Sequence, residues 1–226
     1  MDKTDLDAFE RTLVEINPGI KVRFKDESLF QKALGLLVRP FNPTFLTEYT
    51  TTIGSTVYFP SREFYYAKPE SSFSILAHEY VHIWDFKRDR WFKFKYLFPQ
   101  ILGLVPLVVF GLFVWFSAWW LLSLLGLVAV APWSAKKRTS YELRGYGMNV
   151  AIAQWVYGRV QPSSLTYIAD QFVGSSYYYM CRDRKYVEGE LESFRQQAAL
   201  GVLQNYAPYD VAYRFLSSRN NLLPKS

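Results

Sequence analysis

The chain has 226 residues, a formal net charge of +6, and a single cysteine. One cysteine, Cys181, excludes a disulfide framework within the chain and suits a reducing compartment. No repeat, linker or low-complexity tract is present, and the first residues lack the basic and apolar regions of a secretory signal. We therefore expect one domain that is not directed to secretion.

The N-terminal third alternates between helical and strand patterns. Apolar residues recur at helical spacing from Leu6 to Ile16, and residues 20–24 alternate apolar and cationic side chains as a half-buried strand does. A second helix is expected at residues 28–38, and paired strands at residues 45–51 and 55–59. The strand just ahead of residue 60 is expected to form an edge on which a peptide lies by strand addition.

One short stretch, His78-Glu79-Tyr80-Val81-His82, fits the H-E-x-x-H pattern and contains both histidines of the chain. Residues four apart lie on one face of a helix, so His78 and His82 can bind one zinc ion together. Glu79, one step round the helix, then reaches a water on that ion and serves as the general base. The pattern predicts the layout of a zinc hydrolase.

Five residues also match such a pattern by accident, with both histidines serving only in the core or on the surface. The surrounding sequence favours the metal site, because residues 69–72 predict the start of a helix. Lys87, Arg88 and Arg90 follow the motif, where cations favour the end of a helix. The motif is therefore expected on a helix, as its chemistry requires.

A catalytic zinc needs a third protein ligand, and the chain has no third histidine. Arg88 stands where the extended metzincin pattern has its last histidine, which excludes that class. No acidic residue occurs between Asp89 and Glu142, so we expect Glu142, near the start of a helix that ends by Gly158, to complete the site. Asp85 is alternatively expected to orient His82. The competing acidic ligands are Asp85, Asp170, Glu188, Glu190 and Glu192.

Residues 96–135 form a run of forty positions without a charged side chain. One membrane crossing takes about 20 apolar residues, so the run predicts a helical hairpin that crosses twice, with its turn at residues 116–118. Trp115, Trp119 and Trp120 lie in the middle, where the tip would meet the far interface. The alternative is a hairpin buried inside a soluble protein or a larger assembly.

The net positive charge of the chain lies beside this run, because residues 87–95 carry a net +4 and residues 136–138 carry +3, against +6 for the whole chain. Such flanks predict a membrane location with the zinc domain on the cytoplasmic side. Because the charge is explained in this way, nucleic acid is not an expected partner. The expected partners are a protein or peptide substrate and, through residues 96–135, a lipid membrane or a hydrophobic protein.

After Gly158 the sequence predicts a short helix from Pro162 and a longer one over residues 187–206. A peptidase site also needs a donor that steadies the oxyanion. Arg144, Tyr146 and residues 177–179 are candidates that the sequence does not rank.

Taken together, these features resemble gluzincin metallopeptidases, above all the HtpX-type integral-membrane family, which places apolar spans between H-E-x-x-H and a glutamate in a pattern near E-x-x-A-D. Glu142-Leu143-Arg144-Gly145-Tyr146 has that glutamate, with glycine for the alanine and tyrosine for a supporting aspartate. The chain lacks the N-terminal spans of that family. Residues 52–60 and 78–84 are also similar to small metallopeptidase-like proteins of bacteriophages.

The resulting interpretation is an α+β, mainly helical, zincin-like domain with a small N-terminal sheet, interrupted by a hydrophobic helical hairpin. Residues 1–95 carry the H-E-x-x-H helix, residues 96–135 the hairpin, and residues 136–226 the third ligand. The expected activity is that of a zinc-dependent metalloendopeptidase anchored at a membrane. The alternative is a structural or interaction protein of a membrane complex or phage particle that keeps the fold without essential proteolysis.

Overall fold

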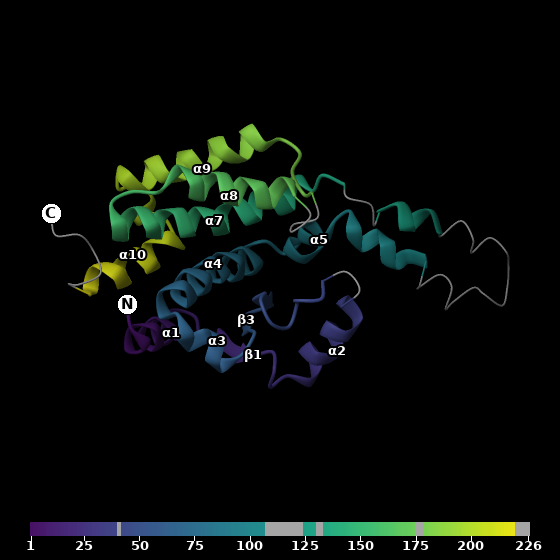
Figure 1. The fold of residues 1–226 in the computed structure, drawn as a ribbon, viewed down its shortest axis with the longest axis horizontal. Helices are drawn as coiled ribbons and strands as arrows, with labels where there is room; N and C mark the ends of the chain where they lie inside the picture. Colours follow the sequence, from purple (N-terminus) through teal and green to yellow (C-terminus); the bar gives the residue numbers. More distant parts are fainter. Residues whose placement is uncertain (40–41, 107–123, 130–132, 175–178, 220–226) are drawn as a thin grey trace.

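The computed structural model describes residues 1–39, 42–106, 124–129, 133–174 and 179–219. Helices predominate there, with one three-stranded sheet near the N-terminus, so the expected mainly helical α+β class is confirmed. Helix α4 lies in the middle, between the sheet and a layer formed by α7, α8 and α9 (Figure 1). In chain order the elements are α1 (Lys3–Ile16), β1 (Lys21–Phe24), α2 (Leu29–Val38), β2 (Thr51–Ile53), β3 (Thr56–Phe59), α3 (Arg62–Ala67), α4 (Pro69–Arg88), α5 (Phe92–Leu97), η1 (Gln100–Leu104), α7 (Lys136–Tyr157), α8 (Pro162–Val173), α9 (Arg184–Ala199), η4 (Leu203–Asn205) and α10 (Tyr209–Ser218).

The sheet has the order β1-β3-β2, with β1 parallel and β2 antiparallel to β3. Strand β3 is thus hydrogen-bonded on both sides. The prediction that the strand just ahead of residue 60 forms an edge is wrong, because a paired strand has no free backbone groups for a peptide to join. In the described sheet, the strand beside β3 on the side away from β1 is β2.

The segment before β2 differs from the expected strand at residues 45–51. Residues 43–48 form turns, and β2 covers only Thr51–Ile53. Three hydrogen bonds explain this: the backbone oxygen of Thr44 accepts two, from the amides of Thr47 and Glu48, and the oxygen of Phe45 accepts one from the buried ammonium of Lys25. Because a local turn satisfies the Thr44 carbonyl and the distant Lys25 satisfies the Phe45 carbonyl, neither is available to a strand ladder.

Helix α4 is the centre of the main core. Its Phe73, Leu76 and Val81 are buried and pack in one cluster with residues of α1, α7 and α10. The expected helix for the H-E-x-x-H motif is thereby confirmed. Helix α7 begins at Lys136 and ends at Tyr157, next to the expected end at Gly158, and it places Glu142 in its second turn, near the start of the helix as expected.

The C-terminal helices form a layer against α7. A second apolar cluster joins α7, α8 and α9 through Leu143, Phe172 and Leu191. The helix predicted over residues 187–206 is shorter at its C-terminal end, because Gly201 follows α9 with a φ of 72° and the chain continues as the 3-10 turn η4. The short helices α3 and α10 were not predicted from the sequence.

The apolar run at residues 96–135 is described only near its two ends. There, residues 124–129 lie against η1 and the residues after it, with the Cβ position of Gly126 only 2.8 Å from the backbone oxygen of Leu102. The expected turn at residues 116–118 lies outside the described residues. Within the described ranges, no helix combines the length and the apolar character needed to cross a membrane. The predicted transmembrane hairpin and the predicted membrane location are therefore corrected here.

Candidate metal centre

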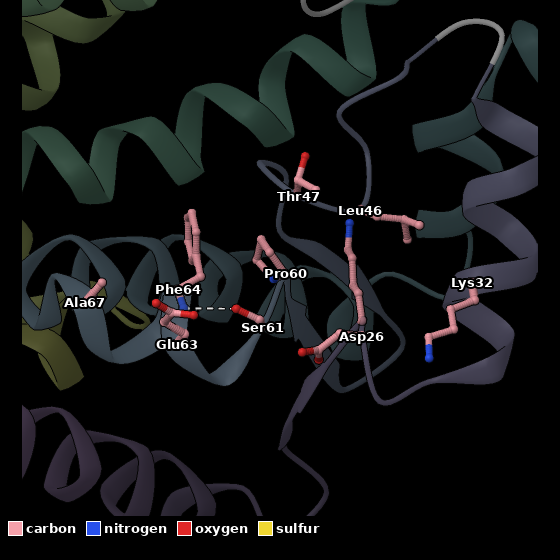
Figure 2. Close-up of a pocket in the computed structure, with 10 residues that line it drawn as sticks. Asp26, Lys32, Leu46, Thr47, Pro60, Ser61, Glu63, Phe64 and Ala67 are labelled. Atoms are coloured by element: carbon pink, nitrogen blue, oxygen red, sulfur yellow. Dashed lines mark hydrogen bonds between the residues drawn. The ribbon is translucent and has the colours of Figure 1, made fainter.

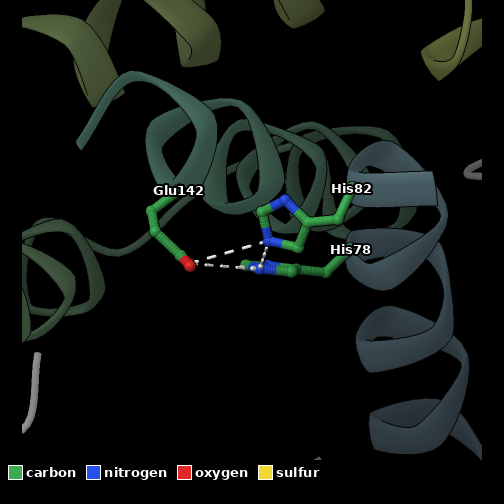
Figure 3. A group of neighbouring side chains, drawn as sticks. All are labelled: His78, His82 and Glu142. Atoms are coloured by element: carbon green, nitrogen blue, oxygen red, sulfur yellow. Dashed lines mark hydrogen bonds and ion pairs between the residues drawn. The ribbon is translucent and has the colours of Figure 1, made fainter. Parts of the chain in front are cut away.

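His78 and His82 on α4 point toward Glu142 on α7, and the three side chains meet at one place (Figure 3). Nε2 of His78 lies 3.1 Å from Nε2 of His82, and Oε2 of Glu142 lies 3.7 Å from each of these nitrogens. Each residue is at most 8% exposed. In the part of the chain that the structure describes, these three form the group of ligating side chains close enough to share one ion.

The spacing of the three atoms suits a single cation. Zinc binds imidazole nitrogen and carboxylate oxygen at about 2.0–2.2 Å in a tetrahedral arrangement, which sets two ligand atoms about 3.3 Å apart. The observed separations of 3.1 and 3.7 Å lie on either side of that value. Two imidazole nitrogens that face each other at such a distance need a cation or a proton between them, because otherwise both present lone pairs.

Asn149 on α7 fixes the orientation of His78. Its amide nitrogen donates to the backbone oxygen of Ser74 at 3.2 Å and to the Ser74 hydroxyl at 2.7 Å, so its oxygen faces Nδ1 of His78 at 2.7 Å. An amide oxygen only accepts, so Nδ1 carries the proton and Nε2 keeps its lone pair for a metal. Sequence reasoning missed Asn149, although its position seven residues after Glu142, two helical turns along one face, is a signal that could have found it.

His82 has a different environment. Its Nδ1 is buried and has no hydrogen-bond partner among the described residues. Burial disfavours a proton on this ring, but the neighbouring carboxylates, first of all Glu142, outweigh burial and raise the pKa of His82 to about 9. In the absence of metal, His82 is therefore protonated at neutral pH, and a metal ion must displace that proton.

Glu142 is 3% exposed and lies among these charges. Burial alone would raise the pKa of its carboxyl group, yet the adjacent histidines hold the pKa well below its ordinary value. The second oxygen of Glu142, Oε1, accepts a hydrogen bond from the hydroxyl of Tyr96 on α5. Sequence reasoning did not find Tyr96, because nothing in the pattern of its aromatic and basic neighbours distinguishes it.

Glu79 follows His78 on α4 and is half-buried. Its negative charge raises the pKa of His82 and partly offsets the lowering of the Lys25 pKa by burial. The side chain therefore acts electrostatically on His82 on one side and on the buried Lys25, just after β1, on the other. A carboxylate beside a metal site in this position is suited to accept a proton from water.

The competing acidic residues lie in other contacts. Asp85 forms an ion pair with Arg144, and the prediction that Asp85 orients His82 is wrong, because within the described chain Nδ1 of His82 has no partner. Asp170 and Glu188 both pair with Arg184. Glu192 pairs with Arg195, and Glu190 lies on the same helix, α9. None of these carboxylates belongs to the group that gathers around the histidines in the described structure.

The predicted oxyanion donors are distributed in several places. The guanidinium of Arg144 is engaged by Asp85, and Tyr146 packs edge-on against the His78 ring with centroids 4.9 Å apart. Tyr179 is exposed, and residues 177 and 178 lie outside the described residues. The hydroxyl of Tyr96, a residue outside this set of candidates, donates a hydrogen bond to Glu142.

A separate cavity of about 540 Å³ lies where β1 and β3 end (Figure 2). Pro60, Phe64 and Leu46 supply apolar walls, and the fully buried Lys25 is part of its lining. None of His78, His82 and Glu142 borders it. This cavity is thus distinct from the metal-ligand group. The charge of Glu79 nevertheless acts on both, because it raises the pKa of Lys25 and that of His82.

No protein-family model, curated protein or solved structure matches the chain. The resemblance to gluzincins and to the phage proteins therefore stands on the motif residues alone.

Proposed function

We propose that this protein is a zinc-dependent metalloendopeptidase of the gluzincin type, with a zincin-like fold, in which His78, His82 and Glu142 bind the metal. The observation that carries the proposal is the convergence of these buried side chains from α4 and α7. The sequence separation between them makes accidental packing of three ligand atoms within 4.8 Å a poor explanation. Two imidazoles and one carboxylate are a donor set that zinc uses in catalytic sites.

When bound, zinc lowers the pKa of a coordinated water toward neutrality and polarises the carbonyl group of the scissile bond. Three residues around the metal position then have separate roles. Glu79 accepts a proton from the attacking water and passes it to the leaving amine nitrogen. Asn149 keeps His78 in the tautomer whose unprotonated Nε2 faces the other two ligands, His82 and Glu142. Glu142 contributes one negative charge, which offsets half of the charge of the cation.

The proposal is tested by measuring bound metal and casein cleavage for the wild type, Glu79→Gln and Glu70→Gln. Glu70 is an exposed glutamate in the first turn of the same helix and serves as the matched control. We expect stoichiometric zinc in all three proteins, and a fall in cleavage of at least about 100-fold in Glu79→Gln alone, because a general base contributes about 10²–10⁴-fold.

Three outcomes would contradict the proposal. Zinc without cleavage in the wild type would identify a structural or interaction protein that keeps a metal site. Iron as the stoichiometric metal would indicate the oxygenase chemistry that also uses two histidines and a carboxylate. A protein without stoichiometric metal would show that the motif is accidental.

A further inference from the structure

Tyr96 connects α5 to the predicted metal ligands. Its hydroxyl donates a hydrogen bond to Oε1 of Glu142, while Oε2 faces the two imidazoles at 3.7 Å from each Nε2. The two oxygens of one carboxylate thus have different partners. A carboxylate held in this way presents one oxygen to a cation instead of two.

The ring of Tyr96 is held by groups from three helices. Phe92 of α5 stacks on it with centroids 5.5 Å apart, and the guanidinium of Arg138 on α7 lies 5.3 Å from its centroid. The His82 ring of α4 meets it edge-on at 6.1 Å. Because these contacts fix the ring, the hydroxyl is positioned toward Glu142 by the fold itself.

We propose that Tyr96 is a positioning residue that makes Glu142 a one-oxygen metal ligand. A catalytic zinc takes three protein ligands and needs a remaining position for water, which a carboxylate free to bind through both oxygens can occupy. In addition, Oε1 belongs to a residue that is 3% exposed, and a buried carboxylate oxygen without a donor is costly. Tyr96 satisfies that oxygen and keeps it away from the metal.

A direct catalytic role is the competing interpretation, because phenols can also stabilise an oxyanion. A phenol has a single proton to donate, and in this structure that proton is directed to Glu142. The inference rests on the metal-binding part of the proposed function. Its readout is metal coordination, so it does not require that the protein cleave peptides.

The test compares Tyr96→Phe with Tyr141→Phe. Tyr141 lies on α7 beside the same Phe92, at 4.7 Å between ring centroids, but its hydroxyl donates to Asp89 at 2.5 Å and not to a metal ligand. Zinc affinity is measured by competition with a chromophoric chelator, and coordination by the visible absorption of the cobalt(II) forms. Loss of an outer hydrogen bond to a metal ligand typically costs about 10–100-fold in affinity, which we expect for Tyr96→Phe only.

We also expect the cobalt(II) bands of Tyr96→Phe to weaken, as they do when a fifth ligand atom joins a four-coordinate ion, while Tyr141→Phe keeps the wild-type spectrum.

Unchanged zinc affinity and an unchanged spectrum in Tyr96→Phe would overturn the inference, as would an affinity loss matched by Tyr141→Phe. Normal metal binding with reduced kcat and constant KM would assign Tyr96 to the reacting atoms instead. A wild type that binds zinc without cleaving casein contradicts the proposed function alone, and one that binds no metal overturns both.

Discussion

The side chain of Asn149 holds the imidazole of His78 by a hydrogen bond of 2.7 Å, and is itself held by two hydrogen bonds to Ser74. Ser74 lies one turn before His78 on α4. A single amide side chain on α7 therefore contacts both residues and fixes their positions relative to each other. The amide cannot turn over without placing its NH₂ group against Nδ1–H and its oxygen against the Ser74 carbonyl. This arrangement determines which nitrogen of His78 is available to a metal.

Removal of this amide is expected to weaken metal binding. In Asn149→Ala the Nδ1–H of His78 loses its acceptor and the ring loses its fixed orientation, so zinc affinity should fall by about 10–100-fold. Ser74→Ala removes one of the two anchors of Asn149 and leaves the backbone oxygen, so a smaller loss is expected. Chelator competition measures both variants. Wild-type affinity in Asn149→Ala would show that Asn149 does not orient the ligand.

Gly145 allows the close approach of His78 to α7. A Cβ atom at this position would lie 2.5 Å from Nε2 of His78, so the imidazole must move to accommodate a methyl group. Gly145→Ala is expected to reduce zinc affinity by at least about 10-fold, because ligand atoms of a metal site tolerate only small displacements. A crystal structure or the cobalt(II) spectrum of the variant would show the displaced ring.

Gly147→Ala is the matched control for that change. The new Cβ would lie 2.7 Å from the ring of Phe194 on α9, and not near a metal ligand. We expect it to destabilise the fold by about 1–3 kcal/mol through overpacking, with zinc affinity preserved in the folded protein. Urea unfolding of the metal-free variants separates the two effects. Equal affinity losses in both glycine variants would contradict the assigned role of Gly145.

The sequence predicts the candidate ligand residues better than the residues that hold them in place. His78 and His82 are identified by a spacing that only requires a helix, and Glu142 by the absence of other acidic residues between it and Asp89. The glycine that replaces the alanine of the gluzincin-like pattern at position 145 has a physical reason that the sequence does not contain, namely the distance to His78. Such distances depend on how α4 and α7 pack.

The misassigned parts of the fold have the same origin. Residues 45–51 carry apolar and β-branched side chains, and a strand is their local preference. The buried ammonium of Lys25 instead takes the Phe45 carbonyl at 2.7 Å, a contact between residues twenty positions apart. Similarly, the pairing of β3 on both sides follows from β1 joining it in parallel, which no local pattern specifies. Tertiary partners, not local propensity, decide these segments.

Lys25 gives a prediction for the pH dependence of stability. It is fully buried, and its ammonium lies 3.7 Å from the centre of the Phe45 ring. Burial lowers the pKa of Lys25 from 10.5 to about 8. Between these two values the unfolded chain binds more protons at Lys25 than the folded one, so its contribution to the free energy of unfolding increases as the pH rises from 8 to 10.5.

Lys25→Met isolates this contribution, because other titrating groups cancel when the two proteins are compared. As the pH rises across that window, the free energy of unfolding of the wild type is expected to increase by roughly 3 kcal/mol relative to that of the variant. Below pH 8 the difference between the two proteins should not change with pH. Urea unfolding at a series of pH values measures the difference, and a flat difference would contradict the buried charge. Glu79→Gln should move the rise to lower pH, because the charge of Glu79 raises the pKa of Lys25. That shift would place the proposed base within electrostatic reach of the sheet.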